Sequence, residues 1–76
     1  MSDARSPVPV PVRTETIALG QFLKLAGACA TGGESKAAVM HGEVAVNGEI
    51  CRQRGRTLHP GDRVRMGGSE WEVARS

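Results

Sequence analysis

The chain has very few aromatic side chains. Among its 76 residues there is no tyrosine, and Phe22 and Trp71 are the single phenylalanine and the single tryptophan. Modules that read single-stranded nucleic acid by stacking several bases need several exposed aromatic rings. The composition argues against that class, so any recognition of nucleic acid is expected to depend on phosphate contacts and on shape.

Long apolar runs are also missing. No apolar stretch approaches the roughly 20 residues that span a bilayer, and the start of the chain lacks the basic and apolar segments of a signal peptide. We therefore expect a cytoplasmic protein without membrane contact. Cysteine is scarce as well, since Cys29 and Cys51 are the two that the sequence holds, fewer than small disulfide scaffolds usually carry. Both are expected to be reduced.

Residues that could carry metal or catalytic chemistry are scattered. Cys29, His41, Cys51 and His59 occur singly, whereas zinc ligands usually come in closely spaced pairs. The glycines match neither a phosphate-binding loop nor a dinucleotide fingerprint, and no nucleophile and base or paired carboxylates can be singled out. The sequence predicts no catalytic residue, no metal and no cofactor.

Positive charge is concentrated in one region. Ten basic residues against eight acidic ones give a net charge of +2, which alone does not indicate nucleic-acid binding. Between Ile50 and Met66, however, five arginines accompany a single acid, Asp62. The five are Arg52, Arg54, Arg56, Arg63 and Arg65.

The first three of these arginines alternate with other residues. Arg52, Arg54 and Arg56 are separated by Gln53 and Gly55, so in an extended chain their side chains would project to the same side. Guanidinium groups bind phosphate through two donors and stack on exposed bases. The alternative is a solvated edge strand that is kept unpaired by its charge. Arg63 and Arg65 either extend the basic patch or simply face outward from a strand.

The N-terminal segment is rich in proline and valine. Residues 6–12 read Ser-Pro-Val-Pro-Val-Pro-Val, and proline removes backbone donors and favours an extended polyproline-like chain. We predict a flexible tail over residues 1–13 and a single domain over residues 14–76.

Hydrophobic spacing in the domain predicts two short helices after a short strand at 14–17. Leu19, Phe22, Leu23 and Ala26 have helical spacing, and Gly27 is expected to end that helix. A second helix is predicted over 34–41, with Gly42 as its stop. Its candidates for the inward face are Ala37, Ala38 and Val39. Ser35 and Lys36 are expected to face solvent.

Alternating residues and turn signals predict strands in the second half. Asn47-Gly48 is a strong signal for a two-residue hairpin turn, and the flanking Val44, Val46 and Ile50 are candidates for the core. Further strands are expected around Val64 and over 70–73, with Gly67-Gly68 as the turn between them. The predicted fold is α+β, with two short helices packed on a small, mostly antiparallel β-sheet.

The order and spacing of these pieces resemble the S-four RNA-binding domain, also called the alpha-L motif. The resemblance spans residues 17–73 and implies that the two helices and the following loop dock on structured RNA, such as ribosomal or transfer RNA, as in small free-standing bacterial members. The matching segments are Leu19-Gly-Gln-Phe-Leu-Lys-Leu-Ala-Gly27, Gly33-Glu-Ser-Lys-Ala-Ala-Val-Met-His-Gly42, Val44-Ala-Val-Asn-Gly48 and Pro60-Gly-Asp-Arg-Val64.

The resemblance also indicates which residues contact RNA. Lys36 matches the basic position inside the second helix, and Lys24 and the Arg52–Arg56 segment are similar to basic positions of compact relatives. Ser35 either bonds a phosphate oxygen or is a small helix residue. The candidate RNA-binding residues are therefore Lys24, Ser35, Lys36, Arg52, Arg54 and Arg56.

One position departs from the family pattern. Many members begin the second helix with Ser-Arg-Ser, whereas this chain has Thr31-Gly32-Gly33 and so lacks the arginine. Backbone N–H groups at Gly32 and Gly33 could receive an anion instead, although the carboxylate of Glu34 opposes it.

The predicted function is RNA binding by a monomer without catalysis, and the ribosome is a further candidate partner. One alternative is an adaptor that binds an acidic protein partner and uses the proline-valine tail as a docking peptide. The other is an accessory subunit of an RNA-modifying enzyme.

Overall fold

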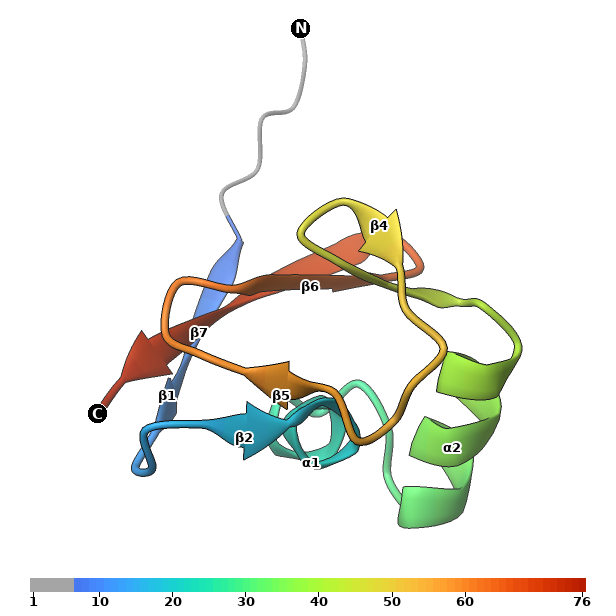
Figure 1. The fold of residues 1–76 in the computed structure, drawn as a ribbon, viewed down its shortest axis with the longest axis horizontal. Helices are drawn as coiled ribbons and strands as arrows, with labels where there is room; N and C mark the ends of the chain where they lie inside the picture. The colour runs from blue at the N-terminus through green and yellow to red at the C-terminus, as the bar shows by residue number, and fades with distance from the viewer. Residues whose placement is uncertain (1–6) are drawn as a thin grey trace, which may run out of the picture.

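The computed structural model describes residues 7–76 and confirms the α+β class (Figure 1). Its helices are α1 (Leu19–Leu25) and α2 (Gly32–Met40). Its strands are β1 (Val8–Val12), β2 (Ile17–Ala18), β3 (Val44–Val46), β4 (Glu49–Ile50), β5 (Thr57–Leu58), β6 (Arg63–Met66) and β7 (Ser69–Arg75). Neither helix in this described range is long and apolar enough to cross a membrane.

The strands form one large and one small sheet. Five strands are arranged in the order β1-β7-β6-β3-β4, and β2 pairs with β5 in the small sheet. All neighbours are antiparallel except β1 and β7, which run parallel. Both helices and the small sheet lie on one side of the large sheet, as Figure 1 shows. The core fills the space between these layers, and Leu19, Phe22, Leu23, Val39 and Leu58 are fully buried there.

The expectation of a flexible segment over residues 1–13 is wrong for Val8–Val12, because this segment is strand β1. Val10 and Val12 are buried in the core, and Val10 lies opposite Val73 of β7. Residues 1–6, the first part of the predicted flexible tail, lie outside the described residues. The β1 segment is therefore part of the sheet and is not available as a free docking peptide.

Edge position explains how a strand can contain prolines. The carbonyl of Val12 accepts a hydrogen bond of 3.0 Å from the Ser76 N–H, so it faces β7. The backbone N–H and C=O groups of successive residues in a strand point to opposite edges. Those of Pro9 and Pro11 therefore point away from β7, to the open edge of the sheet. The missing N–H groups of proline therefore cost no hydrogen bond with β7, while Val10 and Val12 contribute their side chains to the core.

The predicted helix ends are confirmed. Gly27 and Gly42 follow α1 and α2 with φ of 81° and 74°, in the left-handed region that favours glycine. At its start, α2 extends two residues beyond the predicted helix. The hydroxyl of Thr31 caps it by accepting the Glu34 N–H at 3.1 Å, and the Glu34 carboxylate accepts the Ala30 N–H at 2.6 Å. This arrangement resembles a capping box.

The faces of α2 differ from the prediction at two residues. Ser35 was expected to face solvent but is buried, whereas Ala37 was expected to face the core but is exposed. The hydroxyl of Ser35 donates a hydrogen bond of 3.2 Å to the carbonyl of Gly20 in α1. A small polar residue is needed at this helix contact because it satisfies a buried carbonyl while allowing close approach.

The predicted hairpin is present, with one correction. Asn47 and Gly48 join β3 and β4 with φ of 52° and 89°, as the turn signal predicted. Ile50 was expected in the core, yet 59 % of its surface is exposed. Its strand has two residues and lies at the edge of the sheet, and the following Cys51 takes the buried position instead.

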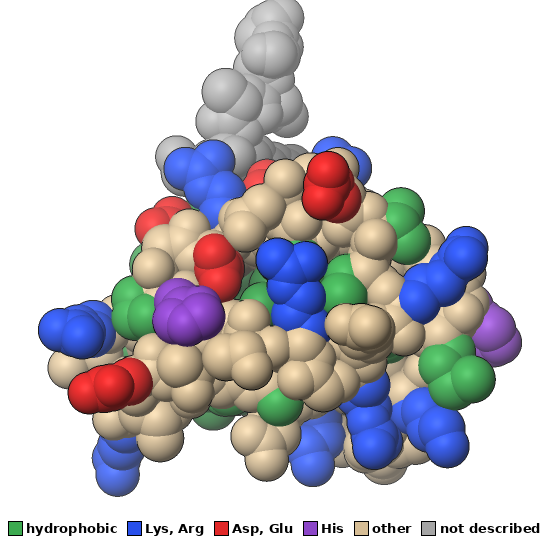
Figure 2. Space-filling model, viewed as in Figure 1, with side chains coloured by type: hydrophobic (Ala, Val, Ile, Leu, Met, Phe, Trp, Pro, Cys, Tyr) green, Lys and Arg blue, Asp and Glu red, His purple; other side chains and the backbone are tan. Residues whose placement is uncertain are grey.

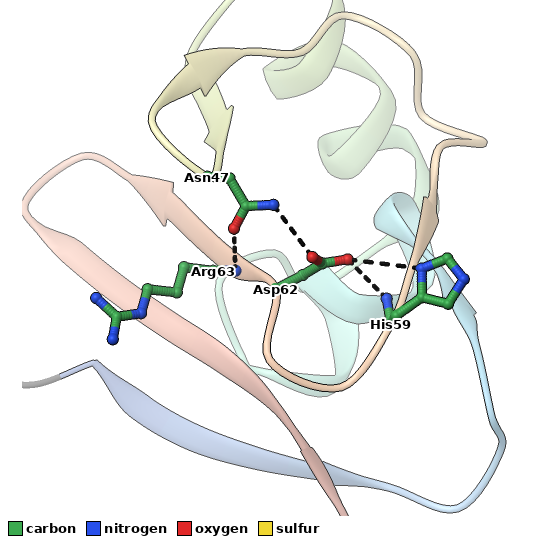
Figure 3. Close-up of polar contacts among 4 residues, drawn as sticks. All are labelled: Asn47, His59, Asp62 and Arg63. Carbon is green, nitrogen blue, oxygen red and sulfur yellow. Dashed lines mark hydrogen bonds and ion pairs between the residues drawn. The ribbon is translucent and has the colours of Figure 1, made fainter.

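A polar network joins this hairpin turn to the turn before β6 (Figure 3). The Asn47 amide donates to the Asp62 carboxylate at 3.1 Å, and its carbonyl accepts the Arg63 N–H at 2.9 Å. The other Asp62 oxygen accepts the His59 N–H at 2.7 Å. Partial burial raises the pKa of Asp62, but these hydrogen bonds, together with positive charge on His59 and Arg56, outweigh it and lower the pKa below its ordinary value.

Replacing Val12 by alanine tests whether β1 belongs to the folded core. We expect Val12→Ala to lower the free energy of unfolding by about 1–3 kcal/mol, because it removes buried apolar surface and leaves a cavity. Val8→Ala in the same strand is the control, since Val8 is 56 % exposed, and its effect should stay within about 0.5 kcal/mol. Equal urea-unfolding curves for the two variants would contradict the assignment of β1.

The acid stability of the chain tests the Asp62 network. Since its pKa is lower in the folded chain, the ionised carboxylate stabilises the fold above the unfolded pKa of about 3.9, and this contribution is lost as the pH falls through the folded pKa. Asp62→Asn should cost about 1–3 kcal/mol at neutral pH because an amide cannot accept both hydrogen bonds.

The measurement is urea unfolding of wild type and Asp62→Asn between pH 7 and pH 2. The difference between their unfolding free energies should shrink as the pH falls below about 4. Glu15→Gln, which changes an exposed carboxylate, serves as the control. A difference that stays constant over the whole pH range would show that the ionised Asp62 does not stabilise the fold.

Candidate nucleic-acid interface

The loop between β4 and β5 is held against the start of α1 by its backbone. The N–H of Leu19 donates to the carbonyl of Arg56 at 2.8 Å, and the N–H of Gly20 donates to the carbonyl of Arg54 at 2.9 Å. Ala18, the residue before the helix, provides no side-chain cap. The first amides of a helix need partners from outside the helix, and here the loop supplies them.

This loop is not extended, so the prediction that its three arginines project to one side is wrong. The N–H of Arg56 donates to the carbonyl of Gln53 at 3.1 Å and closes a turn around Arg54 and Gly55. The arginines consequently meet three different parts of the molecule. Arg56 is half-buried and is close enough to Asp62 to contribute to its lowered pKa.

Arg52 lies against the end of α2. A Cβ built on Gly42 would be 2.8 Å from Nη2 of Arg52, so the absence of a side chain at Gly42 makes room for the guanidinium. The C-terminal end of a helix carries partial negative charge, which favours a cation at this place. Arg52 therefore has a local role at α2 while its side chain remains exposed.

Arg54 lies against the start of α1. A Cβ on Gly20 would be 2.5 Å from Cγ and 3.0 Å from Cδ of Arg54, so the arginine stem occupies the space that a side chain at Gly20 would need. The same two residues share the backbone hydrogen bond described above. Backbone and stem together hold Arg54 beside the helix.

A hollow of about 320 Å³ opens between α1, α2 and the Arg54-Gly55 turn. We call it the interhelix hollow. Gly20 and Ser35 are its buried residues, and its exposed ones include Gln21, Lys24, Gly32, Arg54 and Gly55.

The structure thus brings three of the six predicted site residues to the interhelix hollow. Lys24 and Arg54 are exposed there, whereas Ser35 is buried with its hydroxyl hydrogen bonded to Gly20. Lys36, Arg52 and Arg56 do not line the hollow. Figure 2 shows Lys and Arg side chains gathered at the lower right, over the helical end of the molecule, while the acidic side chains in this view lie mainly over the strands.

Two residues of the hollow were not among the predicted site residues. Gln21 precedes Lys24 by three positions, and this spacing places both on one face of a helix, so the sequence carried a signal for Gln21. The role of Gly20 had no comparable signal, because its partner Arg54 is distant in the sequence and meets it only in the folded chain.

The start of α2 is already occupied by groups of the protein. Thr31 accepts the N–H of Glu34, and the Glu34 carboxylate lies close to the N–H of Ala30. The negative charge of Glu34 at this position stabilises the helix and disfavours an incoming anion. The arrangement supports helix capping here rather than an anion site at Gly32 and Gly33.

The arginines of β6 face acidic residues of β7. Nε of Arg63 lies 3.9 Å from the carboxylate of Glu72, and Arg65 lies opposite Glu70 in the strand register. Opposite charges in paired strands stabilise a sheet modestly. Arg63 therefore has an acidic partner within the sheet, Arg65 lies opposite an acidic residue, and neither arginine lines the interhelix hollow.

The two cysteines are not bonded to each other. Cys29 and Cys51 are both free and buried, as part of the hydrophobic core. Within residues 7–76, no group of three or more His, Cys, Asp and Glu residues is arranged to hold a metal ion.

Comparison with known proteins places the fold in a family. The family model described as "S4 domain" matches residues 10–74, which include the last three residues of β1, every element from β2 to β6 and all of β7 except its last residue. The chain is also 47 % identical over 60 residues to a Bacillus subtilis (strain 168) protein named "Probable ribosome maturation protein RlbA", an alignment that covers 79 % of this chain and 84 % of that protein. On both findings, the chain belongs to the S4 domain family, the S-four family that its sequence resembles.

Proposed function

We propose that this chain binds structured RNA, ribosomal or transfer RNA, through a basic surface made of Lys24, Lys36, Arg52, Arg54 and Arg56. The observation that carries the proposal is the convergence of Lys24, from α1, and Arg54, from a distant loop, on the interhelix hollow. Neither cation has an ion-pair partner among the described residues. Two exposed cations beside a hollow attract phosphate groups.

Membership of the S4 domain family supports a binding role rather than a catalytic one. The relative from Bacillus subtilis is named for ribosome maturation, and we infer a ribosome-related role, with the ribosome or its RNA as the partner and the cytoplasm as the place of action. Ser35 is left out of the proposed RNA contacts, because its hydroxyl joins the two helices.

The contributions of the five cations differ by their surroundings. Arg54 has a stem held against Gly20, so its guanidinium is partly ordered before RNA arrives, and a preorganised donor loses less entropy on binding. Lys24 is a point charge on a helix surface and adjusts to the phosphate that it meets. Lys36, Arg52 and Arg56 extend the positive surface around this centre, and their effect is mainly long-range attraction.

Removal of both cations at the hollow tests the proposal. The variant Lys24→Gln/Arg54→Gln should bind purified ribosomal or transfer RNA at least tenfold more weakly, since charge-assisted hydrogen bonds contribute about 1.5–3 kcal/mol each. In a salt titration, the slope of log K against log salt concentration should become shallower by roughly 0.7–0.9 for each phosphate that the variant no longer neutralises.

A variant with the same change of net charge provides the control. Arg13 and Arg75 are exposed residues at the β1–β2 connection and at the end of β7, away from the helices (Figure 1), and Arg13→Gln/Arg75→Gln should keep most of the affinity. If the two double variants lost the same RNA affinity, the interaction would depend only on net charge and not on the cations at the hollow. Crosslinking and sequencing of RNA bound in cells then identifies the partner, and no enrichment over background would favour a protein partner.

Replacing Gly20 by alanine tests whether Arg54 is held in place for RNA. The added methyl group would collide with Cγ of Arg54, so Gly20→Ala should displace this side chain and weaken RNA binding about as much as Arg54→Gln, about tenfold. In an Arg54→Ala background the collision is absent, and Gly20→Ala should cause no further loss. The measurement is RNA affinity for the four proteins of this cycle, and wild-type affinity of Gly20→Ala would contradict the positioning role.

A further inference from the structure

The interhelix hollow has the size of a pocket for one small ligand. Its volume of about 320 Å³ lies at the small end of the range for ligand pockets, about 300–1,000 Å³. A double helix is far too wide to enter such a space, whereas a single unpaired nucleotide can. The hollow therefore differs in kind from a flat basic surface that follows a phosphate backbone.

Two glycines at the hollow leave this space open. A Cβ built on Gly32 or on Gly55 would meet no other atom within 4 Å, and neither residue has a positive φ. Backbone strain and internal packing therefore do not require glycine at these two positions. An incoming group, by contrast, gains room from the absence of side chains.

The side chains around the hollow match the parts of a nucleotide. A base needs a flat surface to stack on, and the aromatic residues cannot provide it, because Phe22 is fully buried and Trp71 lies on β7. The planar guanidinium of Arg54 can take this role, since RNA-binding proteins stack bases on arginine as well as on aromatic rings.

The remaining groups supply polar contacts. The amide of Gln21 offers a donor and an acceptor, which suits the hydrogen-bonding edge of a base. The ammonium group of Lys24, one helical turn further along α1, suits the phosphate.

We propose that the interhelix hollow receives one unpaired nucleotide of the bound RNA, with its base stacked on Arg54 and read by Gln21, and its phosphate bound by Lys24. This inference rests on the proposed function and narrows it, because the RNA must present a bulged or looped-out nucleotide beside its paired regions. Stacking and hydrogen bonding of an unstacked base are the usual route to specific RNA recognition.

Nuclear magnetic resonance with free nucleotides tests the pocket directly. The ¹⁵N-labelled wild-type protein is titrated with adenosine and uridine 5′-monophosphates and, separately, with inorganic phosphate. We expect the mononucleotides to shift the amide signals of Gly20, Gly32 and Gly55 in a saturable way, and inorganic phosphate to bind more weakly. Gly32→Leu should abolish these shifts by filling the hollow, whereas Gly68→Leu, at the β6–β7 turn, should leave them unchanged.

The same variants are then compared for RNA binding. Gly32→Leu should weaken the affinity for the RNA recovered from cells about tenfold, and Gly68→Leu should retain it. An unchanged signal with mononucleotides, or equal binding of mononucleotides and inorganic phosphate, overturns the nucleotide pocket. RNA affinity that depends on Lys24 and Arg54 but not on the Gly32→Leu change overturns it as well and leaves the proposed function standing. A different result would contradict the proposed function itself, namely that the wild-type protein shows no salt-dependent RNA binding.

Discussion

The start of α1 depends on two hydrogen bonds from a loop far along the chain. A helix of seven residues is too short to be stable alone, and no side chain caps its first turn. The carbonyls of Arg54 and Arg56 accept hydrogen bonds from the first amides of the helix instead. These two hydrogen bonds hold the loop in place as well as the helix. Helix stability and the position of the Arg54 guanidinium are therefore one property of the structure, because the residue that caps the helix also carries the charge. A change that frees the loop would disturb both together.

The local elements were largely predictable from the sequence, because their signals are short-range. Glycine adopts positive φ without strain, and this is why Gly27 and Gly42 mark the ends of the two helices. Asn47-Gly48 specified the hairpin turn for the same reason. The family resemblance rests on the order of these local signals, and the S4 domain match confirms it.

The unpredicted features all depend on contacts between distant parts of the chain. The prolines of residues 7–11 led to the prediction of a flexible segment, because the sequence does not show which strand could pair with it. The partner of β1 is β7, at the other end of the described chain. Ser35 was expected to face solvent, yet its hydrogen bond to the carbonyl of Gly20 in α1 makes it a buried helix contact. The extended reading of Arg52–Arg56 failed because the capping of α1 forces this loop to turn. Of the candidate site, the sequence therefore predicted residue types but not which of them converge.

The parallel pairing of β1 with β7 also constrains how the chain folds during its synthesis. The ribosome releases Val8–Val12 long before Ser69–Arg75, so β1 cannot pair with β7, its neighbour among the described strands, until nearly all described residues have emerged. During this interval Pro9 and Pro11 leave one edge of the nascent segment without hydrogen-bond donors, which disfavours pairing of that edge with another emerging chain. Closure of the sheet by its first strand is thus a late step, and the helices and the hairpin can form while translation continues.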